Sequence, residues 1–273
     1  MSDLALSDLV LSIATAVLAA TAVMTVTALV ARRQGRVVVV DVAWGLGFVV
    51  IAVACAVVAA AAGAGQGLRT GFLVAIVGVW GLRLSWHIHR RSSAHDRGED
   101  PRYLEVLGGP LREVGMGVAV RKVFGVQGAV LPVIALPVAV GVVSEVWCWP
   151  LVVVGGVVWL VGLAFESVGD AQLAAYRAAP RESRRPVLDT GLWRYTRHPN
   201  YFGDACVWWG VWLAGGLASG WIAGLATLVA PVAMTWFLVS VTGVKLLEQT
   251  MMQRPAYVEY ASRTSAFFPL PPR

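Results

Sequence analysis

Residues 37–62, VVVVDVAWGLGFVVIAVACAVVAAAA, form a long apolar run with a single charge, Asp41. A helix needs about 20 apolar residues to cross the roughly 30 Å hydrocarbon layer of a bilayer. This run is long enough to do so. It predicts a transmembrane helix with an acidic residue close to its beginning.

Comparable runs recur along the chain of 273 residues, of which 58% are hydrophobic and 14% charged, unlike a soluble domain. Seven segments fit a membrane: 9–30, 37–62, 71–86, 123–143, 147–168, 202–217 and 221–244. The last four read as two hairpins, broken at Ser144-Glu145 and at 215–220. The sequence therefore predicts an all-α, polytopic membrane bundle of about seven helices, with 1–273 as a single integral membrane domain.

Lysines and arginines predict the orientation of this bundle, because they are retained in cytoplasmic loops. Twenty of the 22 lie on one side, in 31–36, 89–122, 171–201 and the tail from Lys245. The other side has only Arg69, and Arg83 falls inside the third segment. We expect the N-terminus outside and the C-terminus in the cytoplasm, with the protein in the inner (plasma) membrane. The net charge of +6 then records orientation and not nucleic-acid binding.

Polar residues gather at the cytoplasmic ends of five predicted helices. They are Asp41, Arg83 and His87, Glu166 and Asp170, Asp204, and Lys245 and Glu248. Charges beside membrane helices are costly, so each is a functional candidate if it faces the bundle interior. A single interfacial charge can simply extend to water. Eight at one depth instead favour a polar pocket open to the cytosol.

The richest motif is the loop before the sixth segment, residues 188–204, LDTGLWRYTRHPNYFGD. Arg194 and Arg197 can clamp a phosphate, Asn200 can bond an amide, and the aromatic rings can stack on a planar ligand. Pro199 keeps the chain before it from being helical, and a helix N-terminus soon after it favours anions. The alternative is an interfacial belt of aromatic and basic residues.

A second cluster lies at the end of the third segment. Arg83 and His87 are one helical turn apart and share a face, whereas His89 points elsewhere. The two histidines are therefore not placed to hold a metal together, and four histidines in the whole chain are few for a metal-dependent oxygenase. We expect no metal.

A third cluster ends the fifth segment. Glu166 and Asp170 are four residues apart on one face, with Arg177 two turns beyond. Carboxylates accept hydrogen bonds from ribose hydroxyls and arginine pairs with phosphate, although residues at a helix end can also be merely interfacial. The chain has no G-x-G-x-x-G or Walker loop, so a dinucleotide would not be held in a Rossmann fold.

On these residues the chain resembles the steroid 5-alpha-reductase family, specifically a bacterial branch of unassigned function that shares the 3-oxo-5-alpha-steroid 4-dehydrogenase C-terminal domain. The similarity runs roughly from Asp41 to the end. It is most specific at 191–204, at 98–103 and from Arg254-Pro255 through Tyr260 to Phe268-Pro269. The family's members are seven-helix membrane enzymes that use NADPH to reduce a carbon–carbon double bond conjugated to a carbonyl. The resemblance implies that 120–273 is the cofactor-binding part.

The resemblance also implies residue roles. By position, it implies cofactor-binding roles for Asp170, Arg177, Arg185, Asn200, Asp204, Lys245 and Gln249. The full set of expected cofactor-binding residues adds Glu166, Arg194, Arg197, His198, Tyr201 and Tyr260. Lys245 stands where the family has an arginine, and Gln249 where it has a histidine. Asp41 is similar to a carboxylate that holds the substrate carbonyl, and His87 lies at the position of a family tyrosine. A protonated imidazole or a neutral carboxylic acid would polarise the carbonyl while hydride reaches the β carbon.

Three hypotheses remain. The leading one is an NADPH-dependent reductase of a steroid-like or other membrane lipid, with no nucleic-acid partner. Residues 197–201 with a later acidic residue also resemble the isoprenylcysteine and phospholipid methyltransferases, which bind S-adenosylmethionine. The third is a lipid-binding membrane protein that keeps the scaffold without the chemistry.

Overall fold

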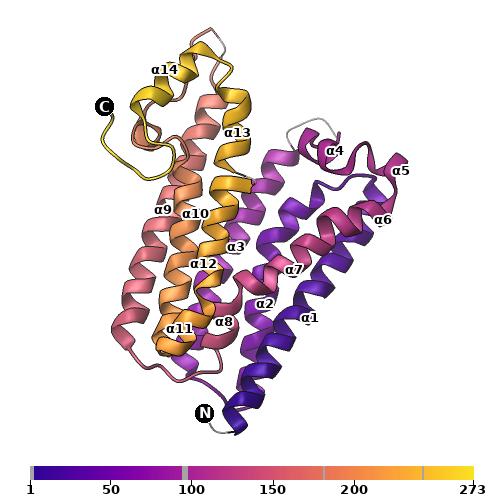
Figure 1. The fold of residues 1–273 in the computed structure, drawn as a ribbon, viewed down its shortest axis with the longest axis vertical. Coiled ribbons are helices and arrows are strands. Elements are labelled where there is room, and N and C mark those ends of the chain that lie inside the picture. The colour runs from indigo at the N-terminus through magenta and orange to yellow at the C-terminus, as the bar shows by residue number, and fades with distance from the viewer. Residues whose placement is uncertain (1–2, 94–97, 181, 242) are drawn as a thin grey trace. The chain divides into compact units, whose positions relative to one another are not determined.

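The computed structural model describes residues 3–93, 98–180, 182–241 and 243–273, and most of them are helical (Figure 1). Six helical runs are long and apolar enough to cross a membrane: Leu6–Gln34, Val39–Ala61, Gly67–Ser92, Met116–Ile134, Trp149–Ala178 and Trp221–Met251. No strand is formed by the described residues. The prediction of an all-α polytopic membrane bundle is confirmed.

The sixth predicted segment, 202–217, is helical but is not among these six runs. The chain passes there through α10 (Pro199–Val211), η3 (Trp212–Gly216) and η4 (Leu217–Ser219). Asn200 and Asp204 lie in the first turns and lower the mean hydropathy. Both ends of the run agree with the sequence, because Pro199 starts α10 and Gly220, at a φ of 115°, separates η4 from α11 (Trp221–Thr227).

The chain divides into two compact units. One comprises Met1–Val152 with Val211–Ala230, and the other Val153–Gly210 with Pro231–Arg273.

The first unit is built on three long helices and a run of short ones. Its helices are α1 (Asp3–Gln34), α2 (Val39–Ala61), α3 (Gly67–Ser93), α4 (Pro101–Leu107), α5 (Leu111–Val114), α6 (Met116–Ala119), η1 (Val120–Phe124), α7 (Gly125–Ile134) and α8 (Leu136–Gly141), together with η3, η4 and α11. Glycines let α2 and α3 approach closely: a Cβ on Gly45 would lie 2.5 Å from the carbonyl oxygen of Gly81. One turn further along α3, the Ser85 hydroxyl donates to the Val42 carbonyl at 2.8 Å. Small residues and a hydrogen bond are typical of membrane helix contacts.

The fourth predicted segment, 123–143, is bent. α7 ends at Ile134 and α8 begins at Leu136, on either side of Ala135. Pro132 lies inside α7 and Pro137 in the first turn of α8, and proline lacks the N–H that continues a helix. The helix also begins earlier than the sequence predicted, since α6, η1 and α7 follow one another without a break.

Arg69, near the start of α3, is fully buried in the first unit. Its guanidinium donates to the Ser219 hydroxyl at 2.8 Å and to the carbonyl oxygens of Gly141 and Ser144. Carbonyl groups at a helix end lack internal partners and carry the negative end of the helix dipole. Arg69 therefore joins the beginning of α3 to the end of α8 and to η4, which gives it a structural role.

The second unit contains most of α9 (Trp149–Ala178) and α10, then α12 (Val229–Trp236), η5 (Phe237–Val241), α13 (Val244–Met251) and α14 (Pro255–Arg263). α9 and α10 pack with little between their backbones. A Cβ on Gly203 would lie 2.5 Å from the Gly162 carbonyl oxygen. A Cβ on Gly210, seven residues later, would lie 2.6 Å from the Gly155 carbonyl oxygen. A spacing of seven keeps these glycines on one face of each helix.

Candidate functional site

A hydrogen-bonded cluster surrounds Asp41, which lies in the first turn of α2 in the first unit. The Tyr103 hydroxyl donates to Oδ1 of Asp41. Nη2 of Arg102 lies 3.1 Å from Oδ2 of the same carboxylate. The side chain of Asp41 is 17% exposed, so the carboxylate is not sealed from a ligand. Two neighbouring residues of α4 thus hold one carboxylate of α2.

Glu99 fixes the segment before α4 against the beginning of α2. Its carboxylate accepts hydrogen bonds from the backbone N–H groups of Val37 and, at 3.0 Å, of Val38. The first N–H groups of a helix have no partner inside the helix, and they attract negative charge. This contact explains why the 98–103 motif folds onto the beginning of α2.

The pKa values of Asp100, Arg102 and Tyr103 are shifted by burial and by neighbouring charges. The hydrogen bond to Asp100 raises the pKa of Arg102, and this effect outweighs burial. Burial raises the pKa of Asp100, but its bonds with Arg102 bring the net pKa below the ordinary value. Burial, followed by the charge of Asp41, raises the pKa of Tyr103. Arg102 is therefore a permanent cation, and Tyr103 is a neutral hydrogen-bond donor at physiological pH.

His87 lies in α3 of the same unit and is half-buried. The hydroxyl that reaches Asp41 belongs to Tyr103, which the sequence analysis did not single out as a catalytic candidate. Helical spacing identifies partners within one helix, such as Arg83 and His87, but not a contact between residues 41 and 103. One feature of the sequence could have identified Tyr103, because the 98–103 motif of the family resemblance ends at this residue. The assignment of His87 stays a prediction.

In the second unit, carboxyl and amide groups meet where α9 contacts α10. Nδ2 of Asn200 donates to Oδ1 of Asp170 at 3.2 Å, and Asp170 is only 8% exposed. Glu166, one turn earlier on α9, is 3% exposed and lies against the backbone of Gly203. Asp204 follows Asn200 by one turn on α10. Asp170 and Asn200 are therefore in contact, with Glu166 and Asp204 one turn away on the same two helices.

Arg197 and Glu248 form a bidentate ion pair. Nε of Arg197 lies 2.7 Å from Oε1 of Glu248, and Nη2 lies 2.8 Å from Oε2. Nη1 of Arg197 donates to the carbonyl oxygens of Ala261 and Thr264 at 2.9 and 2.8 Å. Burial lowers the pKa of Arg197, but the bond to Glu248 leaves the net pKa raised. Four N–H donors of Arg197 are engaged by protein groups, an arrangement that positions the loop.

Two further side chains complete the environment of Glu248. Nε2 of His198 lies 3.0 Å from Oε1, and the Tyr257 hydroxyl donates to the same oxygen at 3.3 Å. The ring of Tyr201 stacks on that of His198 with centroids 5.5 Å apart. Glu248 therefore joins the start of α10 to α13 and α14. The sequence placed Glu248 among the polar residues but gave it no role in cofactor binding.

The loop 188–204 is also fixed to the C-terminal tail. The Thr196 hydroxyl donates to the Phe267 carbonyl at 2.9 Å. The hydroxyl of Tyr260, a buried residue of α14, donates to the Trp193 carbonyl. Two of the three most specific stretches of the sequence resemblance are thus joined by hydrogen bonds.

The remaining expected cofactor residues, Arg177, Arg185, Arg194, Lys245 and Gln249, are exposed. Arg185 pairs with Asp189 at 2.8 Å. Neither Arg194 nor Lys245 makes a hydrogen bond or an ion pair with another residue that the structure describes. These two cations can meet an anion without giving up a protein partner.

The donor set of the second unit fits the chemistry of a nicotinamide dinucleotide. Exposed cations such as Arg194 and Lys245 suit phosphates, and the Asp170–Asn200 pair suits hydroxyl and amide groups. Among the described residues, no group of three or more His, Cys, Asp or Glu side chains is placed to hold a metal ion.

Six apolar spanning helices with polar clusters at helix ends define a multi-pass membrane protein. The chain belongs to the family described as Protein of unknown function (DUF1295), which matches residues 27–264. Searches of the curated proteins and of the solved structures found no match. The family match includes residues of both units, and it contains the Asp41, Asp170 and Arg197 clusters.

Proposed function

We propose that this protein is an NADPH-dependent membrane reductase, acting on a carbon–carbon double bond conjugated to a carbonyl in a steroid-like or other lipid substrate. The observation that carries the proposal is the Tyr103 hydroxyl bonded to Asp41, with Arg102 on the other carboxylate oxygen. A neutral phenol is a suitable donor for a carbonyl oxygen that gains negative charge as hydride adds to the β carbon. The apolar helix α2 beside it suits a lipid substrate.

In this proposal Asp41 and Tyr103 bind and orient the carbonyl. Asp41 holds the phenol in place, and Arg102 holds Asp41, so the donor is positioned before the substrate arrives. When substrate binds, the single phenolic proton of Tyr103 would turn from Asp41 to the carbonyl oxygen and stabilise the enolate charge, and the α carbon would take its proton from water. His87 is retained as a proposed second donor.

The second unit is proposed to hold the cofactor, and NADPH supplies the hydride when bound. Arg177, Arg194 and Lys245 would meet phosphates, while Asp170, Asn200 and Asp204 would bond ribose or amide groups. The remaining residues of the expected set, Glu166, Arg185, Arg197, His198, Tyr201, Gln249 and Tyr260, would shape the site around them. The basic loops support a cytoplasmic position for this side, in the inner membrane.

A binding experiment tests the cofactor. Full-length protein purified in detergent should gain thermal stability with NADPH, and loss of NADPH absorbance should follow when a hydrophobic cyclic enone is added. Asp170→Asn should weaken the stabilisation, whereas Glu259→Gln, an exposed position on α14, should not. Absence of any NADPH effect over several pH values would reject the proposal.

One observation favours a second candidate, a membrane methyltransferase. Arg197 and His198 share the later acidic residue Glu248, and the sequence pattern of these residues resembles the isoprenylcysteine and phospholipid enzymes. Both classes would place a nucleotide-like cofactor near this loop. Stabilisation by S-adenosylmethionine but not by NADPH would reverse the order of the two candidates.

A further inference from the structure

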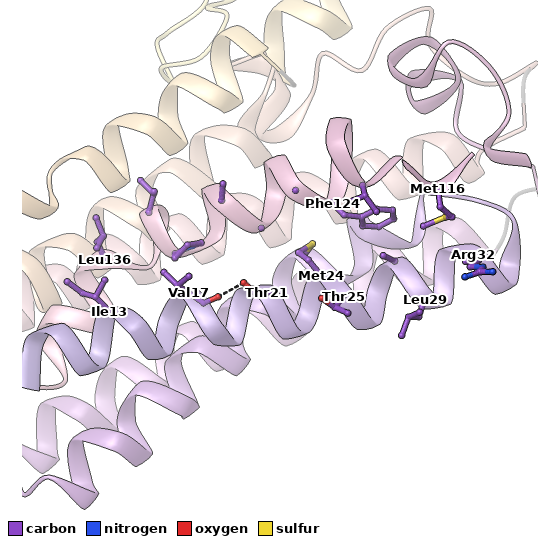
Figure 2. Close-up of a pocket in the computed structure, with 17 residues that line it drawn as sticks. Ile13, Val17, Thr21, Met24, Thr25, Leu29, Arg32, Met116, Phe124 and Leu136 are labelled. Carbon is purple, nitrogen blue, oxygen red and sulfur yellow. Dashed lines mark hydrogen bonds between the residues drawn. The ribbon is translucent and has the colours of Figure 1, made fainter. Parts of the chain in front are cut away.

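A groove of about 770 Å³ lies in the first unit, between α1 and the run from α6 to α8 (Figure 2). Ile13 and Leu136 lie toward one end of it, and Arg32 and Met116 toward the other. Its α1 wall is a stripe of residues three or four apart, including Ile13, Val17, Thr21 and Met24. Such spacing puts them on one face of the helix.

The groove exists because α7 has small residues where it faces α1. Gly125, Gly128 and Ala129 line it, and a Cβ added to Gly128 would meet only Met24, at 3.4 Å. α1 is meanwhile fixed elsewhere, since the Ser12 hydroxyl donates to the Ala139 carbonyl at 2.7 Å. The two helices therefore leave a channel between them that their own side chains do not fill.

The wall of the groove suits a hydrocarbon chain. Most lining side chains are aliphatic or aromatic. The hydroxyl of Thr21 donates to the Val17 carbonyl at 2.8 Å, so it presents its methyl group rather than an unsatisfied donor (Figure 2). From Ile13 to Arg32, α1 rises by about 28 Å, which is long enough for an extended acyl chain. The groove's volume lies in the range of ligand sites.

One end of the groove is cationic. Arg32 lines it and is exposed, and no hydrogen bond or ion pair joins Arg32 to another described residue. Arg112 lies against the backbone of Gly35, one turn beyond Arg32, because a Cβ there would be 2.9 Å from its Nε. Arg112 is also exposed and has no such bond within the described part of the chain. Arg32 lines the groove, and Arg112, which does not line it, lies beside Gly35 just beyond that end, so both cations complement an anion there.

We propose that this groove binds an anionic phospholipid, with an acyl chain between α1 and α7 and the phosphate at Arg32 and Arg112. The site is independent of the proposed reductase activity, since none of its residues belongs to the Asp41 or Asp170 clusters. It would make the stability of the first unit depend on the charge of the surrounding lipid.

The test uses full-length, delipidated protein in neutral detergent, titrated with dioleoyl phosphatidylglycerol or dioleoyl phosphatidylcholine, with bound lipid counted by native mass spectrometry. Phosphatidylglycerol should bind more tightly. Arg32→Gln should weaken its binding about five-fold, the contribution of one cation near a charged lipid, and Arg112→Gln should do the same. Gly128→Leu, which fills the groove, should reduce the binding of both lipids.

Arg33→Gln is the matched control, because Arg33 is exposed beside Arg32 but does not line the groove. It should bind like the original protein. Equal binding of the two lipids, an Arg33→Gln loss as large as that of Arg32→Gln, or unchanged binding in a folded Gly128→Leu protein would each overturn the proposal. So would a lipid-free dimer, in which a second copy covers the groove.

Discussion

The two oxygens of Asp41 have different partners and therefore different roles in the proposed reaction. Oδ2 is held by Arg102, whose own position is fixed by Asp100 at 2.8 Å. Oδ1 accepts the hydrogen bond of the Tyr103 hydroxyl, and in the proposed reaction this single donor is redirected to the arriving carbonyl. Removing Tyr103 should therefore affect the reaction more than the fold.

Tyr103→Phe tests this at the level of chemistry. It removes the donor to the carbonyl, so kcat for enone reduction should fall by about 100-fold or more, the usual contribution of a positioned proton donor. Stabilisation by NADPH should be unchanged, because the expected cofactor residues lie elsewhere. Tyr195→Phe, an exposed tyrosine of the loop, serves as the control. A Tyr103→Phe enzyme with full kcat would remove Tyr103 from the mechanism.

The raised pKa of Tyr103 also predicts a dependence of stability on pH. Burial and the charge of Asp41 raise this pKa above the ordinary 10.0, so the folded protein holds the phenolic proton more tightly than the unfolded chain. Its contribution is present below about pH 10 and is lost as the pH rises through the folded pKa. Above about pH 10 the apparent Tm should therefore fall more steeply in the original protein than in Tyr103→Phe. Parallel curves would contradict this.

Glu248 should be a stability residue. Glu248→Gln leaves the Arg197 guanidinium, only 11% exposed, without its anion, and the apparent Tm should fall by about 5 °C or more. Arg197→Gln should do the same. The double variant should lose less than the sum of the two, since the residues share one interaction. Additive losses would show that the ion pair is not the stabilising element.

At the scale of elements, helix contacts depend on glycines that hydropathy does not reveal. A segment's mean hydropathy predicts that it crosses the membrane, but not which face meets which neighbour. For that reason α9 and α10 could be expected as two apolar helices from the sequence, whereas the contact of Gly162 with Gly203 could not. The bend at Ala135 was foreseeable from Pro132 and Pro137, but an apolar run alone predicts one straight segment.

Gly203→Ala should separate α9 from α10. Its Cβ would lie 2.5 Å from backbone atoms of Gly162 and Glu166, which cannot move without shifting a helix. Alanine favours a helix by up to about 1 kcal/mol over glycine, so a loss of stability would have to come from the contact. Gly78→Ala on α3 is the control, because no atom lies within 4 Å of its Cβ position. The apparent Tm should fall for Gly203→Ala and should stay the same or rise for Gly78→Ala. The opposite result would contradict the close contact of α9 and α10 at Gly203.

At the scale of the whole molecule, amino-acid composition was sufficient to predict a membrane protein. The spacing of residues along the chain was not sufficient to predict which side chains meet in the site. Apolar runs specify membrane helices because burial in lipid is a property of each segment alone. Asp41 could be selected from its depth, since depth follows from sequence position within a helix. Tyr103 could not, because its contact with Asp41 depends on how the 98–103 segment folds back. The same limit applies to Glu248 and Arg197, which meet across 51 residues.

The orientation of the chain gives the last prediction. Basic residues fill 31–36, 89–122 and 171–201, and the predicted outer side has only Arg69, which is buried and bonded. Because Arg69 has a structural role, its presence on the predicted outer side does not contradict the excess of lysine and arginine on the predicted cytoplasmic side. In a protein whose cysteines are replaced by serine, a cysteine at Gly63 should react with a membrane-impermeant maleimide added to intact cells. A cysteine at Gln253 should react only after permeabilisation. Labelling of both positions from outside would mean that the residues between them cross the membrane an even number of times. The segment 202–217, which is the one predicted apolar segment not among the six spanning helices, would then not cross it.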